Sequence, residues 1–412
     1  MKITHIEIFD CNVSEVDSSL YYFNPVLVRI HTDTGISGIG EAGISYGTGS
    51  HAAVGMVRDM AQLLIGKDPM NCEGIWEYLF RGSFWAMSTG PIVYAAISAL
   101  DIALWDIRGK VFQAPIYKLL GGKTHNSLRA YAGQLQFGWG DVQTALFDPK
   151  DYAEAAQIAL GEGYDCVKVD PIVFYDGDKN AMTTPKASYY GLLTQTDIDM
   201  ACARIQAVRE TVGKNVDIIL EAHSLLGVNA AIQLGRAVEP FNIMYYEEPI
   251  HPMNLENMTL VAREVHIPLA SGERIYSRWG YRPFFEKQAL AVIQPDICTC
   301  GGITEVKKIC DMAESYDTAV QIHICGTPVT TAAALQVEAV IPNFIIHEHN
   351  TVARKKAMTD MCIHDYQPVN GSFTVPDLPG LGNEFNDEVM CRYLVHTVRG
   401  LSKTREEMSC LR

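Results

Sequence analysis

Three short apolar runs decide the fold of this chain, and each ends in a glutamate: Asp217-Ile-Ile-Leu-Glu221, Ile243-Met-Tyr-Tyr-Glu247 and Pro268-Leu-Ala-Ser-Gly-Glu273. The glutamates follow one another at two equal intervals of 26 residues. A short β-prone run followed by about twenty residues that suit a helix is typical of a repeated βα unit. The runs therefore predict successive strands of a parallel barrel, each with one carboxylate at its C-terminal end, where barrel enzymes hold their catalytic groups.

Three carboxylates that converge on one barrel mouth repel one another unless a cation neutralises them. An all-oxygen ligand set is the one that a hard divalent cation such as Mg²⁺ prefers. The spacing thus predicts one Mg²⁺ ion per subunit, held by Glu221, Glu247 and Glu273. The alternative is three unrelated surface glutamates, and two equal intervals that each close a strand-like run argue against it.

The bulk composition is ordinary for a globular protein. The chain has 412 residues, of which 48% are hydrophobic and 20% charged, enough for two domains. A formal net charge of −15 argues against nucleic acid and anionic membranes as partners. The sequence shows no apolar leader and no run of the roughly 20 apolar residues that a membrane span needs, and its cysteines form no CxxC pair. We therefore expect a cytoplasmic protein with reduced thiols.

The pattern of the chain divides it into three parts. Residues 1–125 carry an alternating strand, a second strand, a hairpin signal and then helical periodicity, which predicts an α+β capping domain. In that domain the cluster Phe84–Met87 is expected to pack rather than contact a ligand. Residues 356–412 are turn-rich and are expected to return to the capping domain. Residues 126–355 alternate strand-like and helical runs, with strands expected at 128–132, 165–170, 217–221, 243–247, 268–271, 291–294, 319–324 and 344–347.

Further polar side chains stand at the ends of these predicted strands. Lys168 and Asp170 are two residues apart on the second strand, so their side chains share one face. The same holds for Glu221 and His223 if the third strand extends to both. A single strand-end lysine is usually solvated, but a neighbouring metal site favours a chemical role for Lys168.

The last three strands add a second group of candidates. Asp296 and His323 are 27 residues apart at the ends of neighbouring strands. This predicts an Asp–His dyad, in which the carboxylate orients the ring and favours its protonated form. A histidine in an apolar strand is more often a core group, but the preceding aspartate favours chemistry. In His347-Glu348-His349 the alternation of a strand selects Glu348 as the side chain that faces the barrel interior.

These motifs resemble the enolase superfamily, in its mandelate racemase and muconate lactonizing enzyme branch. The resemblance covers essentially the whole chain. It rests on the cap-helix signature Ala96–Lys110, on Tyr246-Glu-Glu-Pro249 and Ser271-Gly-Glu273 as metal-ligand motifs, and on the interval from Asp296 to His323. It implies an α/β fold, a modified (β/α)7β barrel with an N-terminal α+β cap that the C-terminal tail completes. It also implies bound Mg²⁺ and a homo-oligomer, from dimer to octamer.

Within that superfamily, His223, His323 and Glu348 together are most similar to the galactonate dehydratase-like acid-sugar dehydratases. The resemblance implies a sugar acid whose carbon 2 loses a proton to His323 while His223 protonates the hydroxyl that leaves carbon 3. The product is then a 2-keto-3-deoxy acid. Glu348 would stabilise the developing oxyanion or position the substrate, and Asp170, Glu348 and His223 are expected to contact the substrate.

Two positions depart from the family pattern. Glu221 stands where the first metal ligand is usually aspartate, and Lys168-Val-Asp170 stands where many relatives have Lys-x-Lys. Lys168 is then a base or an electrostatic support, and the case for two-base racemisation is weakened. Two alternatives stay open: a racemase or epimerase that uses Lys168 and His323, and a catalytically weak relative that binds acid sugars. The loops expected to select the sugar, 17–24, 44–50 and 172–193, do not identify it.

Overall fold

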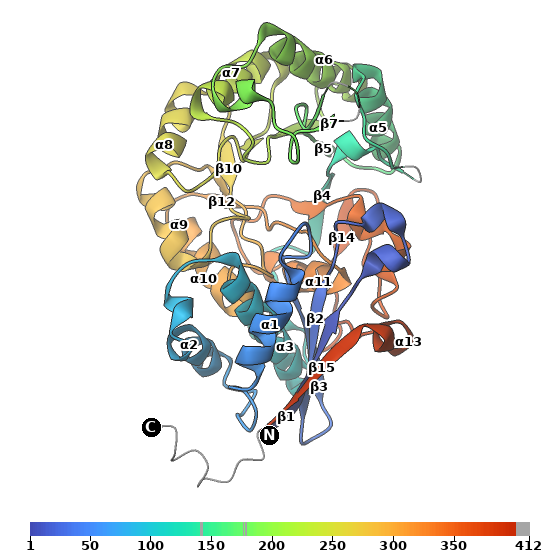
Figure 1. Ribbon diagram of the computed structural model, residues 1–412, viewed down its shortest axis with the longest axis vertical. Helices are drawn as coiled ribbons and strands as arrows, with labels where there is room; N and C mark the ends of the chain where they lie inside the picture. Colours follow the sequence, from blue (N-terminus) through green and yellow to red (C-terminus); the bar gives the residue numbers. More distant parts are fainter. Residues whose placement is uncertain (141–142, 176, 178, 401–412) are drawn as a thin grey trace.

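The protein consists of a barrel and a capping domain that lies against it (Figure 1). The computed structural model describes residues 1–140, 143–175, 177 and 179–400. Within these residues, no helix is both long and apolar enough to span a membrane.

In the part of the barrel that the structure describes, eight parallel strands lie at the positions that the sequence predicted to within a few residues. They are β4 (Ser127–Ala132), β5 (Cys166–Val169), β8 (Asp217–Glu221), β9 (Tyr246–Glu247), β10 (Leu269–Ser271), β11 (Val292–Ile293), β12 (Ala319–Val320) and β13 (His347–His349). Neighbours pair in the order β12-β11-β10-β9-β8-β5-β4-β13. The ring closes where the Val320 amide donates to the Asn343 carbonyl at 2.9 Å and the Ile345 amide donates to the Val320 carbonyl at 3.0 Å. The expected barrel is thus confirmed.

The seventh strand is shorter than predicted, and its neighbour explains why. The sequence favoured a strand over 319–324, but β12 ends at Val320. The amides of Gln321 and His323 still donate to the carbonyls of Ile293 and Pro295, at 3.0 and 3.3 Å. Pro295 has no N–H with which to return a hydrogen bond, so the regular ladder stops there. One isolated bridge, between Asp296 and His323, continues the pairing.

Among the described residues, seven helices connect the strands and surround them (Figure 1). They are α5 (Pro149–Gly161), α6 (Gln195–Val212), α7 (Val228–Val238), α8 (Leu255–Glu264), α9 (Ser277–Glu286), α10 (Gly302–Glu314) and α11 (Pro328–Glu338). Because helices cover the outside and side chains fill the inside, a barrel strand is buried on both faces. All four residues of β5 are accordingly buried.

The capping domain is an antiparallel sheet covered by helices. Its strands are β1 (Ile3–Asp10), β2 (Val26–Thr32), β3 (Ser37–Ala42) and β15 (Leu394–Arg399), in the order β15-β1-β2-β3, and its main helices are α1 (Ser50–Ala61), α2 (Cys72–Gly82) and α3 (Pro91–Phe112). Gly40 lets α3 approach β3 closely, since a Cβ atom there would lie 2.0 Å from the Ala99 carbonyl oxygen. The C-terminal segment thus contributes β15 to the cap sheet, and it also contributes β14 (Ser372–Thr374), which pairs with β4.

One expectation for the capping domain is wrong. The side chains of Phe84, Trp85 and Met87 were expected to pack, but they are 67%, 73% and 52% exposed. Helix α2 ends at Gly82, so these residues lie outside the helical period that buries Ile75 and Leu79. Phe84 precedes a short 3₁₀ turn, Trp85–Met87, in which Ala86 is the buried residue.

Two buried acids of the cap hold the N-termini of barrel helices. Glu41 accepts hydrogen bonds from the amides and hydroxyls of Thr327 and Thr330 at the start of α11, the shortest at 2.6 Å. Asp101 accepts from the amide and hydroxyl of Thr304 in the first turn of α10, at 2.9 and 2.6 Å. Carboxylates suit these ends because unpaired amides and the helix dipole make them electropositive.

The protonation of Glu41 should couple folding stability to pH. Burial raises the pKa of Glu41 from its usual 4.5 to about 7, although the hydrogen bonds from Thr327 and Thr330 lower it. Between these values the native state holds a proton that the unfolded chain has released, so the free energy of unfolding should fall as pH rises from about 4.5 to about 7 and then level off. At about 1.4 kcal/mol per pKa unit, the fall is about 3 kcal/mol.

Urea unfolding of the wild type and Glu41→Gln across this pH range measures this fall. The variant should lack it, while a similar contribution from Asp101, whose pKa burial also raises to about 7, should remain. Glu77→Gln, at a glutamate paired with Arg81 on the surface, is the matched control and should keep the wild-type curve. Parallel curves for the wild type and Glu41→Gln would contradict the assignment.

Candidate active site

The predicted metal ligands lie at one mouth of the barrel. Glu221 ends β8 and Glu247 ends β9, and the two residues pair in register. Both side chains are almost fully buried, and the Oε2 atom of Glu247 has no hydrogen-bond partner. Glu273 follows β10 by two residues, and its side chain is 20% exposed.

Lys168 on β5 supplies the positive charge between these carboxylates. Its Nζ atom lies 3.2 Å from Glu221 Oε2, 2.9 Å from Glu247 Oε1 and 2.9 Å from Glu348 Oε1. Burial alone would lower the pKa of Lys168, but Glu247 and Glu348 outweigh it and raise the pKa well above its usual value. Lys168 is therefore a charged ammonium in this structure.

Glu348 faces the barrel interior, as the alternation of its strand indicated. Its neighbours point away from it: His347 pairs with Glu338 at 2.6 Å, and His349 contacts the Tyr164 hydroxyl at 2.6 Å. Burial alone would raise the pKa of Glu348, but Lys168 and His323 outweigh it and lower the pKa. Glu348 is therefore ionised, and an ionised carboxylate accepts hydrogen bonds but donates none.

Glu273 is turned away from the other two glutamates. Its Oε2 atom lies 2.9 Å from His323 Nε2, and its Oε1 atom pairs with the Arg274 guanidinium, which also pairs with Glu248. Among the described residues, the three predicted ligands do not bring their oxygens within 4.8 Å of one another. The sequence analysis missed Arg274 and Glu248, although each directly follows a predicted ligand.

The donor set nevertheless fits a hard divalent cation. All the donors are carboxylate oxygens, and one of them, Glu247 Oε2, is buried without a hydrogen bond. Burial and the nearby Glu221 raise the pKa of Glu247 well above its usual value, so added positive charge would stabilise its ionised form. Participation of Glu273 requires its carboxylate to leave His323.

The predicted dyad of Asp296 and His323 is formed. Asp296 Oδ2 lies 2.7 Å from His323 Nδ1, and Asp296 Oδ1 accepts a hydrogen bond from the Cys298 amide at 2.7 Å. The aspartate is thus held at both oxygens and fixes the ring. Burial alone would lower the pKa of His323, but Glu273 and Asp296 outweigh it and raise the pKa well above its usual value.

A second histidine dyad was not anticipated. His223 Nδ1 lies 2.5 Å from Asp170 Oδ2, and Asp170 Oδ1 accepts from the amides of Ile172 and Val173 at 3.0 and 2.9 Å. Asp170 thus lies behind His223 and is not among the residues that line the cavity, where the sequence analysis expected it to contact substrate. Burial alone would lower the pKa of His223, but Glu221 and Asp170 raise it to about 9.

The sequence analysis allowed a strand that extends from Glu221 to His223, but the structure does not have one. Strand β8 ends at Glu221, and both His223 and Ser224 have positive φ, at 45° and 58°. The His223 amide donates to Glu221 Oε1 at 2.7 Å. This turn, rather than strand alternation, brings His223 to the cavity.

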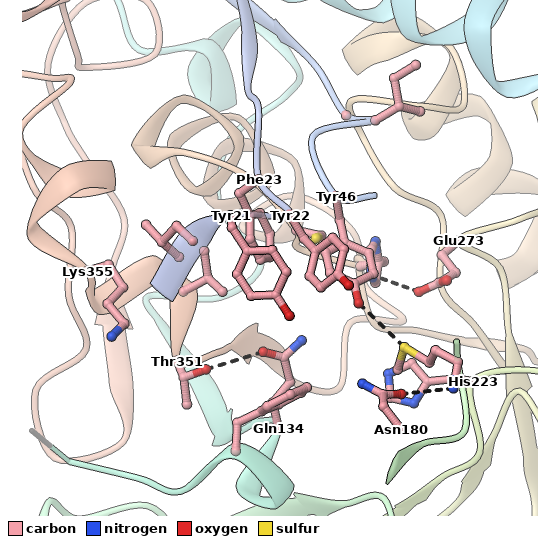
Figure 2. A pocket seen from close by; sticks show the side chains of 18 of the residues that line it. Tyr21, Tyr22, Phe23, Tyr46, Gln134, Asn180, His223, Glu273, Thr351 and Lys355 are labelled. Atoms are coloured by element: carbon pink, nitrogen blue, oxygen red, sulfur yellow. Dashed lines mark hydrogen bonds and ion pairs between the residues drawn. The ribbon is translucent and has the colours of Figure 1, made fainter. Parts of the chain in front are cut away.

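A cavity of about 600 Å³ lies between the barrel mouth and the cap. Figure 2 shows the cap tyrosines Tyr21, Tyr22 and Tyr46 on one side of it, and Gln134 and His223 of the barrel on the other. Its wall includes residues from all three loops that the sequence analysis associated with substrate selection. It also includes the positively charged side chains Arg274 and Lys355. The loop residues are Ser19, Leu20, Tyr21, Tyr22, Phe23, Ile44, Tyr46, Thr48, Phe174, Asn180 and Met182.

Comparisons with known proteins match almost the whole chain. The Enolase C-terminal domain-like family matches residues 151–389, and the N-terminal domain of the Mandelate racemase / muconate lactonizing enzyme family matches residues 19–121. The chain is 34% identical over 370 residues to the D-galactonate dehydratase of Variovorax paradoxus, covering 88% of this chain and 89% of that protein. It is 31% identical over 378 residues to the D-xylonate dehydratase of Haloferax volcanii, covering 91% and 86%.

Solved structures agree with these sequence matches. A member of the enolase superfamily from Salmonella Typhimurium is 48% identical, with a TM-score of 0.92, and the match covers 97% of this chain and all of that one (100%). The 3,6-anhydro-D-galactonate cycloisomerase of Zobellia galactanivorans is 27% identical, with a TM-score of 0.79 over 96% of this chain and 100% of that one.

Loss of the Lys168 charge should destabilise the protein when no divalent cation is present. Lys168→Met leaves buried carboxylates without their counter-charge, which costs about 3–5 kcal/mol of unfolding free energy. Urea unfolding in EDTA measures this loss.

Lys150→Met is the matched control, because Lys150 forms a surface ion pair with Glu154 at 3.3 Å. Such exposed pairs contribute about 0.5 kcal/mol or less. An unchanged urea midpoint for Lys168→Met would show that another group balances the carboxylates.

Proposed function

Because the chain belongs to the mandelate racemase and muconate lactonizing enzyme family of the enolase superfamily, we propose that it is a Mg²⁺-dependent acid-sugar dehydratase. One observation carries the reaction type: two histidines, His223 and His323, line the same cavity and each is held at Nδ1 by a buried aspartate. Dehydration needs one group that accepts a proton and one that donates a proton, and this pair can supply both.

The substrate class follows from the cavity and from the relatives. The relatives named D-galactonate and D-xylonate dehydratase act on sugar acids with six and five carbons, and this chain covers most of their length. Tyrosine hydroxyls and side-chain amides line the cavity and suit a polyol chain. Arg274 and Lys355 in its wall favour an anionic substrate despite the net charge of −15.

Glu221, Glu247 and Glu273 would hold the cation. When bound, Mg²⁺ supplies positive charge against the dianion that develops as carbon 2 loses its proton. The side chain of Glu221, which stands where the family pattern usually has the shorter aspartate, is held by hydrogen bonds from the amides of Ala222 and His223 to Oε1, at 3.0 and 2.7 Å.

His323 is the group that accepts the proton from carbon 2. Asp296 occupies Nδ1, so the lone pair that accepts the proton must be on Nε2. In this structure Nε2 faces Glu273. Burial lowers the pKa of His323, but the charge of Glu273 is one of those that outweigh burial and raise it. Withdrawal of Glu273 into the ligand set would free Nε2 and remove one of the charges that raise that pKa, so that Nε2 could accept a proton.

His223 is the group that donates a proton to the hydroxyl leaving carbon 3. Burial lowers the pKa of His223, but Glu221 and Asp170 outweigh this effect and raise the pKa to about 9. His223 therefore carries that proton at neutral pH. The C–O bond breaks, water leaves, and the resulting enol tautomerises to a 2-keto-3-deoxy acid. Glu348, expected from the sequence to contact the substrate, is not among the residues that line the cavity. Being ionised, it accepts hydrogen bonds from Lys168 and the Ile324 amide and would orient Lys168.

The geometry favours dehydration over two-base epimerisation. Lys168 would be the second base, yet its ammonium contacts three carboxylates and is not among the residues that line the cavity. Burial lowers the pKa of Lys168, but Glu247 and Glu348 outweigh this effect and raise the pKa. The raised pKa opposes loss of the proton that a second base would need to give up. A homo-oligomer and a cytoplasmic location stay predictions.

A screen of hexonates, pentonates and aldarates with Mg²⁺ tests the reaction class. We expect a 2-keto-3-deoxy product, detected as its semicarbazone, that EDTA abolishes and that His323→Asn reduces at least about 100-fold, the usual contribution of a general base. His266→Asn, at an exposed histidine outside the cavity, is the control and should retain activity. Exchange of the carbon 2 proton in D₂O without loss of water would instead identify an epimerase, and neither reaction on any acid would favour the binding protein.

Calorimetric titration with Mg²⁺ tests the ligand set without reference to turnover. Glu247→Gln removes one anionic donor and should weaken Mg²⁺ binding by at least about tenfold. Glu77→Gln, on the surface of the cap, should bind Mg²⁺ as the wild type does. Wild-type affinity in Glu247→Gln would require a different ligand set.

A further inference from the structure

Three potential metal ligands meet on one face of the cap sheet. The antiparallel register of β1 and β2 sets His5 directly opposite His31. Glu7 lies two residues along β1 and so shares this face, whereas Ile6 and Ile8 are fully buried on the other. Figure 1 shows this part of the sheet, beside the N-terminus, at the end of the molecule opposite the barrel.

The side chains of these residues are already in contact. The rings of His5 and His31 stack with their centroids 4.1 Å apart and their planes within 4°. Glu7 Oε2 lies 2.9 Å from His31 Nε2. One ligand atom from each of the three residues lies within 4.8 Å of the others, and no other such group occurs in the described part of the chain.

The chemistry of this group differs from that of the barrel glutamates. Two imidazoles and one carboxylate suit Zn²⁺ and similar transition metals, whereas Mg²⁺ prefers oxygen ligands alone. Burial, with a smaller effect of His31, lowers the pKa of His5, so its ring is neutral and able to bind a metal. Three protein ligands leave a fourth position for water.

The surroundings can tolerate an added cation. Two positively charged side chains face the cluster. Arg29 Nη1 lies 3.8 Å from Glu7 Oε2, and Arg399 lies on β15 directly opposite His5. Arg29 also pairs with Asp387 and lies 5.1 Å from the ring centre of Phe385, so it keeps these partners when Glu7 binds a metal. The side chains of Glu7 and His31 are 20% and 25% exposed, so solvent reaches the cluster.

We propose that His5, Glu7 and His31 form a second metal site, specific for Zn²⁺-like transition metals, that links β1 to β2 and stabilises the cap. This site is independent of the cation in the barrel and of the dehydratase reaction.

The test measures Zn²⁺ bound to the full-length protein by equilibrium dialysis with excess Mg²⁺ present. Wild type should bind one more equivalent of Zn²⁺ than His31→Ala, and Zn²⁺ should raise the melting temperature of the wild type more than that of the variant. His266→Ala is the matched control: His266 is an exposed histidine 3.2 Å from Glu239, without a third ligand in the described residues, and should behave as the wild type. Equal Zn²⁺ binding by the wild type and His31→Ala would overturn the proposal.

A second measurement does not depend on a variant that disturbs the cap. Diethyl pyrocarbonate labels accessible histidines, and mass spectrometry locates the label. Zn²⁺ should protect His5 and His31 in the wild-type protein but leave the exposed His51 and His266 labelled. Equal labelling of His5 and His31 with and without Zn²⁺ would also overturn the proposal. Glu7→Gln, which keeps the size of the side chain but removes its charge, should lose most of the protection.

Discussion

The charge balance around Lys168 is the constraint on which the barrel mouth depends. A parallel barrel brings the ends of neighbouring strands together, and here these ends carry Glu221, Glu247 and Glu348, buried side chains whose charges repel. One ammonium contacts all three and offsets part of this repulsion, although burial and Glu221 still raise the pKa of Glu247 well above its usual value. Although burial lowers the pKa of Lys168, the same carboxylates raise it well above its usual value and keep the ammonium charged. Lys168, which the sequence left as a base or an electrostatic support, contacts three carboxylates as their counter-ion in this structure.

The cap and the barrel share the cavity, and buried carboxylates set their relative position. Glu41 and Asp101 each bind the first turn of a barrel helix, so the cap loops lie over the strand ends. The histidines come from the barrel, whereas the tyrosines that face them come from the cap (Figure 2). The cap therefore supplies one wall of the cavity, and the barrel supplies the histidines and a second wall that includes Phe174, Asn180 and Met182.

The sequence predicted those parts of the structure that repeat. Strand spacing located the barrel, the three glutamates and the Asp296–His323 dyad, because each follows from an interval along the chain. It could not locate interactions that depend on a turn or on distant segments. The positive φ of His223 and its contact with Asp170, 53 residues away, leave no periodic signal. The same is true of Glu273, whose carboxylate pairs with His323 and Arg274.

The chain closes the cap sheet with β15, a strand that comes from the opposite end of the sequence to its neighbour β1. During synthesis the ribosome therefore completes the whole barrel before β1 acquires its outer partner. Throughout that time the outer edge of β1 carries unpaired amides and carbonyls, which is the kind of edge that pairs with other chains. Until β15 emerges, nascent copies of this protein thus carry an open edge that the finished cap sheet covers.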